Sequence, residues 1–252
     1  IAEKEEKLPN LLIVVHLAGH PVDMEAIGKL KNKFKFNVIE DASHSIGSIQ
    51  GDVYTGSCKN SDITVFSFHP VKLITTGEGG VATTNNEDLY KKMHLLRSHG
   101  ITRDLDYKKR GIWEYDQIDL GFNYRMTDIQ AALGRSQLKK LRKYIEKRNQ
   151  IADYYKSKLE DLPLQTQKLS EDSYSSFHLY LIMLNLDKAK YSHKECHQKM
   201  RDNGILVNLH YRPIYLMPYY TRLNKNFRPG YCQNAEHYAE SAMSLPIHTR
   251  LK

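Results

Sequence analysis

The chain has 252 residues, of which 40% are hydrophobic and 26% charged, and its formal net charge is +8. This length is enough to bury a substantial core, in one large or two modest domains. No stretch approaches the roughly twenty apolar residues that a membrane-spanning helix needs. We therefore expect a globular protein of the cytoplasm without a membrane partner.

Hydrophobic periodicity predicts that strands and helices alternate in the first half of the chain. Short apolar runs bounded by polar residues indicate strands, and amphipathic stretches indicate helices. Such alternation favours an α/β fold with a mainly parallel sheet layered with helices. The predicted strands are 11–16, 37–39, 62–67 and 79–84, the predicted helices are 24–34 and 86–97, and the polar residues 101–122 are expected to form an irregular excursion.

A long periodic stretch opens the second half. Residues 127–159 are long enough for one or two helices, and Thr127 with Gln130 resembles a capping box at their start. The pattern beyond predicts a smaller α+β unit, with strands at 178–184 and 205–210 and a helix at 193–202. We expect three parts, namely a large domain over 1–126, linking helices over 127–160 and a small carboxyl-terminal domain over 161–252.

The positive net charge is compatible with nucleic-acid binding, because phosphate contacts use Lys and Arg. The basic residues are scattered, however, and their densest group, at 139–148, alternates with apolar residues at helical spacing. That pattern is typical of an amphipathic helix with a solvated face. We expect no nucleic-acid partner.

The cysteines and histidines give no sign of a metal site. Cys58, Cys196 and Cys232 are odd in number and lack a C-x-x-C pairing, so we expect free thiols. The twelve histidines form no H-E-x-x-H or comparable ligand spacing. The glycine-rich run at 77–80 lacks the G-x-G-x-x-G spacing of a dinucleotide site. We expect no metal.

Lys72 and Asp41 are the most informative residues. Lys72 is a lone charge in the apolar stretch 70–74, where burial favours a neutral amine. Asp41 follows an apolar alternation and would emerge at the carboxyl end of a strand, where open α/β sheets place ligand sites. A Schiff-base lysine and a carboxylate that holds a pyridinium proton are the two protein groups that pyridoxal phosphate chemistry needs. Taken singly, a solvated surface lysine and a turn aspartate are the simpler explanations.

Five motifs, in order, carry a resemblance over nearly the whole chain. In sequence and spacing they resemble the DegT/DnrJ/EryC1/StrS family of sugar aminotransferases. Within it they are similar to enzymes that aminate C4 of a UDP-linked 4-keto-6-deoxy N-acetyl sugar on the pseudaminic acid route. The resemblance implies a fold-type I pyridoxal phosphate transferase with L-glutamate as amino donor. The motifs are EDASHSIGS at 40–48, SFHPVKLITTGEGG at 67–80, RSHG at 97–100, GFNYRMTDIQAALG at 121–134 and VNLHYRPIY at 207–215.

The resemblance also implies roles for individual residues of the large domain. Lys72 would be the catalytic lysine that forms the Schiff base, and Asp41 would be the partner of the pyridine nitrogen. Ser67 would bind the cofactor phosphate. His44 stands where the family carries Gln or His beside the cofactor ring.

Three further residues connect the site to its partners. Asn123 matches the asparagine that reaches the cofactor phosphate of the neighbouring subunit, which implies a homodimer with a shared active site. His210 and Tyr211 match a segment that borders the sugar-nucleotide pocket. Residues 1–126 would then be part of the large cofactor-binding domain.

The chain departs from the family pattern at both ends. Family members carry a further amino-terminal segment, with a Gly-Thr-x-Ala phosphate-binding turn and an aromatic residue that stacks on the cofactor, and they continue into a last helix. We therefore expect a truncated form. Alternatives are a sugar 3-aminotransferase, a sugar 3-dehydratase and a non-catalytic interaction or scaffold protein. Dehydratases of the family replace the lysine by histidine, so Lys72 counts against a sugar 3-dehydratase.

Overall fold

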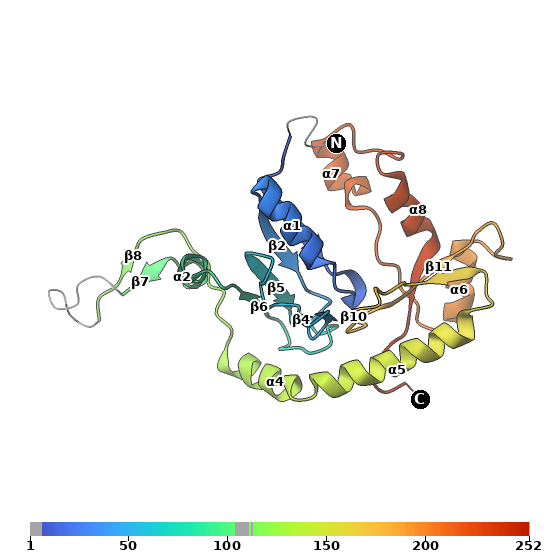
Figure 1. Cartoon of the computed structure of the whole chain (residues 1–252), viewed down its shortest axis with the longest axis horizontal. Coiled ribbons are helices and arrows are strands. Elements are labelled where there is room, and N and C mark those ends of the chain that lie inside the picture. Colours follow the sequence, from blue (N-terminus) through green and yellow to red (C-terminus); the bar gives the residue numbers. More distant parts are fainter. Residues whose placement is uncertain (1–6, 104–110, 112, 252) are drawn as a thin grey trace. The chain divides into compact units, whose positions relative to one another are not determined.

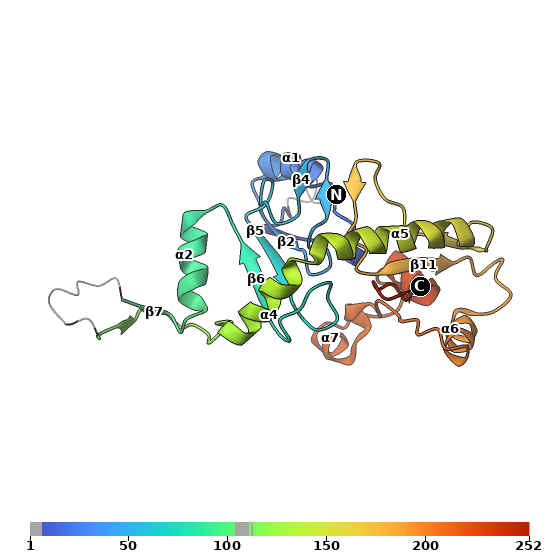
Figure 2. The ribbon, with the colours of Figure 1, turned by 90° about the horizontal axis from the view of Figure 1, so that it is seen from below.

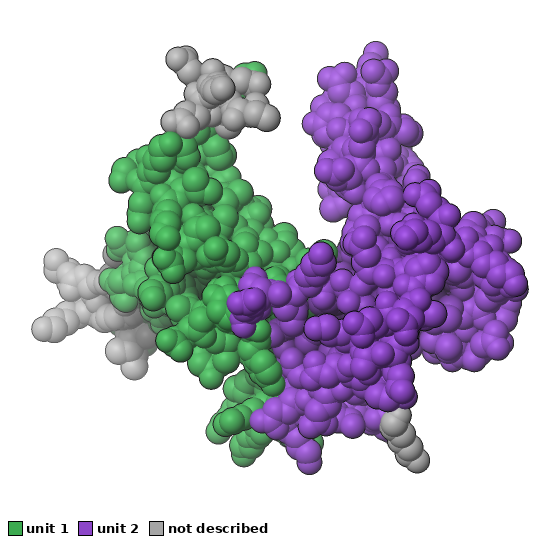
Figure 3. All heavy atoms as spheres, turned by 45° about the vertical axis from the view of Figure 1, so that its right-hand side comes forward, with its two compact units in different colours: residues 1–142, 172–174 green, residues 143–171, 175–252 purple. Residues whose placement is uncertain are grey.

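The computed structural model describes residues 7–103, 111 and 113–251. The chain divides into two compact units, which Figure 3 distinguishes by colour. Unit 1 comprises 1–142 with 172–174, and unit 2 comprises 143–171 with 175–252. Helix α5 (Leu141–Leu159) begins in unit 1 and continues in unit 2. Within the described residues, no helix combines the length and the apolar character needed to cross a membrane.

A four-stranded sheet in the order β1-β2-β5-β6 forms the centre of unit 1 (Figures 1 and 2). Its strands are β1 (Leu11–Val15), β2 (Asn37–Asp41), β5 (Ile63–Ser67) and β6 (Gly80–Thr83). The first three run parallel, as predicted, but β6 is antiparallel to β5. The connection between them contains no helix, and a parallel neighbour needs a long crossover that is usually helical. Gly80 allows β6 to approach closely, since a Cβ there would lie 2.7 Å from the Phe66 carbonyl oxygen.

Helix α1 (Met24–Phe34) covers one face of this sheet. Asp23 caps it by accepting a hydrogen bond from the Ala26 N–H at 2.9 Å, and Lys35 ends it in the left-handed conformation. The predicted helix 24–34 is therefore confirmed at both ends. The residues that pack between helix and sheet are Val14, Met24, Phe36 and Val38.

The opposite face of the sheet is apolar and exposed. Side chains alternate along a strand, so the register places Val15, Asp41 and Val65 in one row of this face across three strands. Val15 is 50% exposed and Ile13, in the next row, is 59% exposed. Parallel sheets are ordinarily covered on both faces. The carboxylate of Asp41 therefore projects from the side of the sheet that α1 does not cover.

Two neighbouring valines of β1 test this difference between the faces. Val14→Ala should lower the free energy of unfolding by about 2 kcal/mol, because Val14 is only 7% exposed beneath α1. Val15→Ala carries the same loss of β propensity but removes an exposed side chain, so it should cost at least about 1 kcal/mol less. Urea denaturation of the two variants checks the pair. Equal losses would contradict an exposed second face.

The other elements of unit 1 include helices α2 (Glu87–Leu96) and α4 (Asp128–Leu138). The predicted capping box is confirmed, since Thr127 and Gln130 exchange hydrogen bonds at the start of α4. The predicted irregular excursion contains a short antiparallel pair, and its residues 104–110 and 112 lie outside the described ones. The remaining elements are η1 (Leu17–Gly19), β3 (Ile49–Gln50), β4 (Val53–Tyr54), β7 (Ile101–Thr102), β8 (Asp116–Gln117) and β10 (Ser173–Tyr174).

Unit 2 has an antiparallel sheet in the order β12-β11-β9 and a core of its own. The strand predicted at 205–210 is wrong: within the described chain this segment makes a single bridge, from Asn208 to Ser244 of β12. Alternating apolar residues indicated a strand, but no second pair extends the ladder. The elements of unit 2 after α5 are β9 (Leu164–Thr166), β11 (Tyr180–Leu184), α6 (His193–Asp202), η2 (Ile214–Leu216), α7 (Pro218–Leu223), α8 (Gln233–Ser241) and β12 (Ala242–Leu245).

Candidate active site

Asp41 and Ser67 end two neighbouring parallel strands, β2 and β5. Asp41 pairs with Val65 in the register, and Ser67 lies two residues beyond Val65, so Asp41 and Ser67 share the face that α1 leaves exposed. The Asp41 carboxylate accepts a hydrogen bond from the Ser43 N–H at 3.0 Å, which fixes its direction. A polar site at the carboxyl edge of the sheet follows.

Lys72 lies in a tightly held loop after β5. Its N–H donates to the His69 carbonyl at 3.0 Å, and the next two residues, Leu73 and Ile74, are buried. The Phe68 carbonyl accepts from the Thr76 N–H at 3.1 Å and from the Thr75 hydroxyl at 2.7 Å, which closes the loop. Local apolar burial thus fixes the backbone that carries the lysine.

The amine of Lys72 is electrostatically tuned. Burial lowers its pKa below the ordinary value for lysine, and the negative charge of Asp41 opposes this shift without reversing it. The charge of Asp41 thus acts on the Lys72 amine, as expected for two parts of one site. An amine with a lowered pKa is neutral for a larger fraction of the time near neutral pH, and the neutral amine is the nucleophile.

His44 is buried in the turn that follows β2. Its Nδ1 accepts a hydrogen bond from the Ala18 N–H at 3.2 Å. Ala18 belongs to η1, the short helical turn directly after β1, so the ends of β1 and β2 are joined through this ring. The side chain thus lies at the same edge of the sheet as Asp41.

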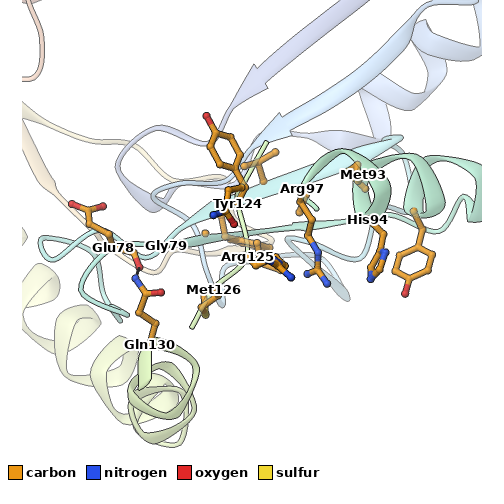
Figure 4. A pocket seen from close by; sticks show the side chains of 16 residues that line it. Glu78, Gly79, Met93, His94, Arg97, Tyr124, Arg125, Met126 and Gln130 are labelled. Atoms are coloured by element: carbon orange, nitrogen blue, oxygen red, sulfur yellow. Dashed lines mark hydrogen bonds between the residues drawn. The ribbon is translucent and has the colours of Figure 1, made fainter. Parts of the chain in front are cut away.

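Asn123 lies on the segment between β8 and α4 of unit 1. It forms a single bridge with Ser98 and lines a pocket of about 840 Å³ bordered by β6, α2 and the start of α4. Figure 4 shows Arg97 and Arg125 among the side chains that line this pocket. Two guanidinium groups give it a positive character that suits an anion. The residues lining it do not include Asp41, His44, Ser67 or Lys72, but they include Val65, the β5 residue that pairs with Asp41.

His210 and Tyr211 belong to unit 2, where they line a pocket of about 450 Å³. The His210 Nδ1 lies 3.0 Å from the Ser244 hydroxyl. Burial raises the pKa of Tyr211, which is therefore a neutral hydroxyl at neutral pH. Tyr238 also lines this pocket, and its buried hydroxyl has no hydrogen-bond partner among the described residues.

Three residues beside these sites were not predicted from the sequence. Glu40 and His16 form a buried pair directly behind Asp41, and Tyr238 joins the pocket of unit 2 from α8. The only signal for Glu40 was its place inside an apolar strand, one residue before Asp41. Among the described residues, no group of three or more His, Cys, Asp or Glu side chains could hold a metal ion.

A family model covers the chain almost completely. The model of the DegT/DnrJ/EryC1/StrS aminotransferase family matches residues 2–252. The chain belongs to this family. The resemblance predicted from its five motifs is therefore confirmed.

Members of the DegT/DnrJ/EryC1/StrS family are similar to the chain in sequence and structure. A UDP-4-amino-4,6-dideoxy-N-acetyl-beta-L-altrosamine transaminase of Campylobacter jejuni is 38% identical over 98% of this chain and 63% of its own. PseC of Helicobacter pylori, an aminotransferase involved in pseudoaminic acid biosynthesis, matches 95% of this chain and 62% of its own, at 34% identity and a TM-score of 0.83. The PMP form of Spr1654 from Streptococcus pneumoniae matches 99% of this chain and 68% of its own, at 29% identity and a TM-score of 0.86.

These structures confirm the predicted fold class, a fold-type I transferase with an α/β sheet layered with helices. Spr1654 is also known in a PLP form, so a relative of this fold binds the cofactor that Lys72 and Asp41 suggested. The chain spans somewhat less than two thirds of the length of the curated relatives it matches.

Proposed function

We propose that this chain is the major part of a cytoplasmic, pyridoxal phosphate-dependent aminotransferase. It would transfer the amino group of L-glutamate to the C4 ketone of a UDP-linked 4-keto-6-deoxy N-acetyl sugar. The observation that carries this proposal is the half-buried Lys72, whose pKa is lowered by burial and which interacts with Asp41 at the carboxyl edge of a parallel sheet. The names of the Campylobacter and Helicobacter relatives support the choice of substrate.

The residues present fit pyridoxal phosphate. Lys72 offers an amine that can be neutral, Asp41 a carboxylate held by a backbone N–H, and Ser67 a hydroxyl on the same face. Asp41 and Ser67 lie on the face opposite α1, where a planar ring would have access to both. When bound, the cofactor supplies an electron sink that makes the Cα–H bond of an amino acid acidic.

Lys72 has two tasks in this proposal. Its Nζ would hold the cofactor covalently, and as a free amine it would accept the proton from the Cα of the amino donor. The same Nζ would deliver that proton to the cofactor carbon that carries the amino group, and would act in reverse in the second half of the reaction, as general acid and base. Both tasks need an amine whose pKa lies below that of an ordinary lysine, which burial provides here.

Asp41 and Ser67 position the cofactor. The Asp41 carboxylate would keep the pyridine nitrogen protonated by direct charge pairing, and this makes the electron sink effective. The Ser67 hydroxyl, at the end of the neighbouring strand, would donate a hydrogen bond to the phosphate. His44 would lie against the ring from the turn after β2.

Three residues would meet the partners of the reaction. Asn123, beside Arg97 and Arg125 in its positive pocket, would reach the cofactor phosphate of a second subunit, so the active enzyme is a homodimer. His210 and Tyr211 would contact the nucleotide sugar through the pocket of unit 2.

The proposal is tested by adding pyridoxal phosphate to the purified chain and recording its absorption spectrum before and after borohydride. We expect a visible band that borohydride removes, and mass mapping should place the label on the peptide that contains Lys72. The absence of a labelled peptide would favour the non-catalytic alternative for this chain.

A further inference from the structure

A buried hydrogen-bonded pair, Glu40 and His16, lies behind the candidate active site. Glu40 is 4% exposed and His16 is 1% exposed, and the His16 Nε2 lies 2.8 Å from the Glu40 Oε2. The second carboxylate oxygen accepts hydrogen bonds from the Ser61 hydroxyl and, at 3.0 Å, from the Thr64 hydroxyl. Nothing in the proposed reaction uses this pair, and a buried charge costs free energy unless hydrogen bonds or an opposite charge offset it.

The side chain of Glu40 is an ionised carboxylate that accepts hydrogen bonds. Burial acts to raise its pKa, but the hydrogen bonds from His16, Ser61 and Thr64 together lower the pKa below the ordinary value. An ionised carboxylate can only accept hydrogen bonds. The His16 Nε2 that faces it must therefore carry a proton.

The other nitrogen of His16 is fixed as well. Its Nδ1 lies 3.0 Å from the backbone nitrogen of Val22, which can only donate. The ring thus joins the first and last residues of the segment 16–22, and the backbone N–H of His16 donates to the Asp41 carbonyl at 3.1 Å. One side chain closes the loop at its base and ties it to the strand that carries Asp41.

The closed loop presents one backbone donor to the active site. Ala18, at its tip, is 1% exposed and adopts a left-handed φ of 60°, which is uncommon for a residue with a Cβ. Its N–H points to the His44 Nδ1 at 3.2 Å. Because a backbone N–H cannot accept, the His44 Nδ1 is unprotonated and the ring carries its proton on Nε2.

We propose that Glu40 and His16 are positioning residues that hold His44 in the Nε2–H tautomer, through the loop 16–22. His44 then offers the cofactor a hydrogen-bond donor, a property that it shares with the side-chain amide of glutamine. That His44 faces the cofactor rests on the proposed function, whereas the tautomer itself follows from the contacts of the chain alone.

Nuclear magnetic resonance of the histidine rings tests the inference without cofactor. Long-range proton–nitrogen correlations on the ¹⁵N-labelled chain distinguish the two tautomers from the cation. In the wild-type chain at neutral pH we expect both His16 and His44 as Nε2–H tautomers. A His44 ring that carries its proton on Nδ1, or is doubly protonated, would overturn the proposal.

The variant Glu40→Gln tests the role of the buried charge. It keeps the shape of the side chain but weakens the hydrogen bond to His16, because charge-assisted bonds are about twice as strong as neutral ones. We expect His44 to populate both tautomers and the Ala18 amide to exchange about tenfold faster with solvent. An unchanged His44 spectrum and Ala18 exchange rate in this variant would overturn the positioning role.

Asp62→Asn is the matched control. The Asp62 carboxylate belongs to the same unit and accepts from the Lys31 amine and the Val38 N–H, each at 2.7 Å. Asp62→Asn should lower stability without moving the His44 signals. If the His44 signals shift in this variant, they report a general loosening of the unit, and the proposal would be overturned. Failure of the proposed function would appear separately, as an unlabelled Lys72 in a chain whose His44 tautomer is intact.

Discussion

Lys72→Ala should abolish both turnover and the borohydride-stable label on the chain. The variant removes the nucleophile that holds the cofactor and the base that moves the proton, so a loss of at least about 10⁴-fold in turnover is expected. Lys72→Arg should be as inactive, because a guanidinium retains the charge but does not become neutral in proteins. Amination of the nucleotide keto-sugar with glutamate measures turnover, and mass mapping measures the label.

Lys29→Ala is a suitable control for this experiment. Lys29 is exposed on α1 and pairs with Glu25 one turn earlier, so its removal should leave label and turnover unchanged. A label that persists at another lysine in Lys72→Ala, with turnover retained, would refute the assignment of Lys72.

The sequence was most informative where local chemistry decides the structure. Helix α1 could be predicted at both ends because Asp23 is a capping residue and the apolar stripe stops at Phe34. The antiparallel direction of β6 could not be predicted, because it depends on the path of the connection rather than on any residue in the strand. The prediction of a strand at 205–210 was wrong for the opposite reason. Its residue pattern is that of a strand, but among the described residues only Asn208 forms a bridge.

The residues of the candidate site likewise differ in whether the local sequence could predict them. Asp41 could be predicted because it ends an apolar strand, and Lys72 because it interrupts an apolar loop. Glu40 could not, since its neighbour in sequence points to the exposed face while Glu40 itself points beneath α1 towards His16. A contact between residues 24 positions apart leaves no local trace in the sequence.

Asp41→Asn should change two properties of the site in opposite directions. Loss of the carboxylate removes the group that would keep the pyridine nitrogen protonated, and turnover should fall by about 100-fold or more. The same change removes the negative charge that raises the pKa of Lys72, so burial alone acts on the amine and its pKa should fall further. At a fixed pH below that pKa, a larger fraction of Lys72 is then neutral.

Chemical acylation of Lys72 measures this fraction, because only the neutral amine reacts. Its pH profile should shift to lower pH in Asp41→Asn, so Lys72 becomes more reactive while the enzyme becomes slower. Asp62→Asn is the control, because the Asp62 carboxylate accepts hydrogen bonds from the Lys31 amine and the Val38 N–H. It should change neither the pH profile of acylation at Lys72 nor the turnover. General unfolding would expose every lysine and raise the pKa of Lys72 towards its ordinary value, which is the opposite shift. A faster-reacting lysine in a slower enzyme is therefore a signature that only a direct Asp41–Lys72 coupling at the site of catalysis produces.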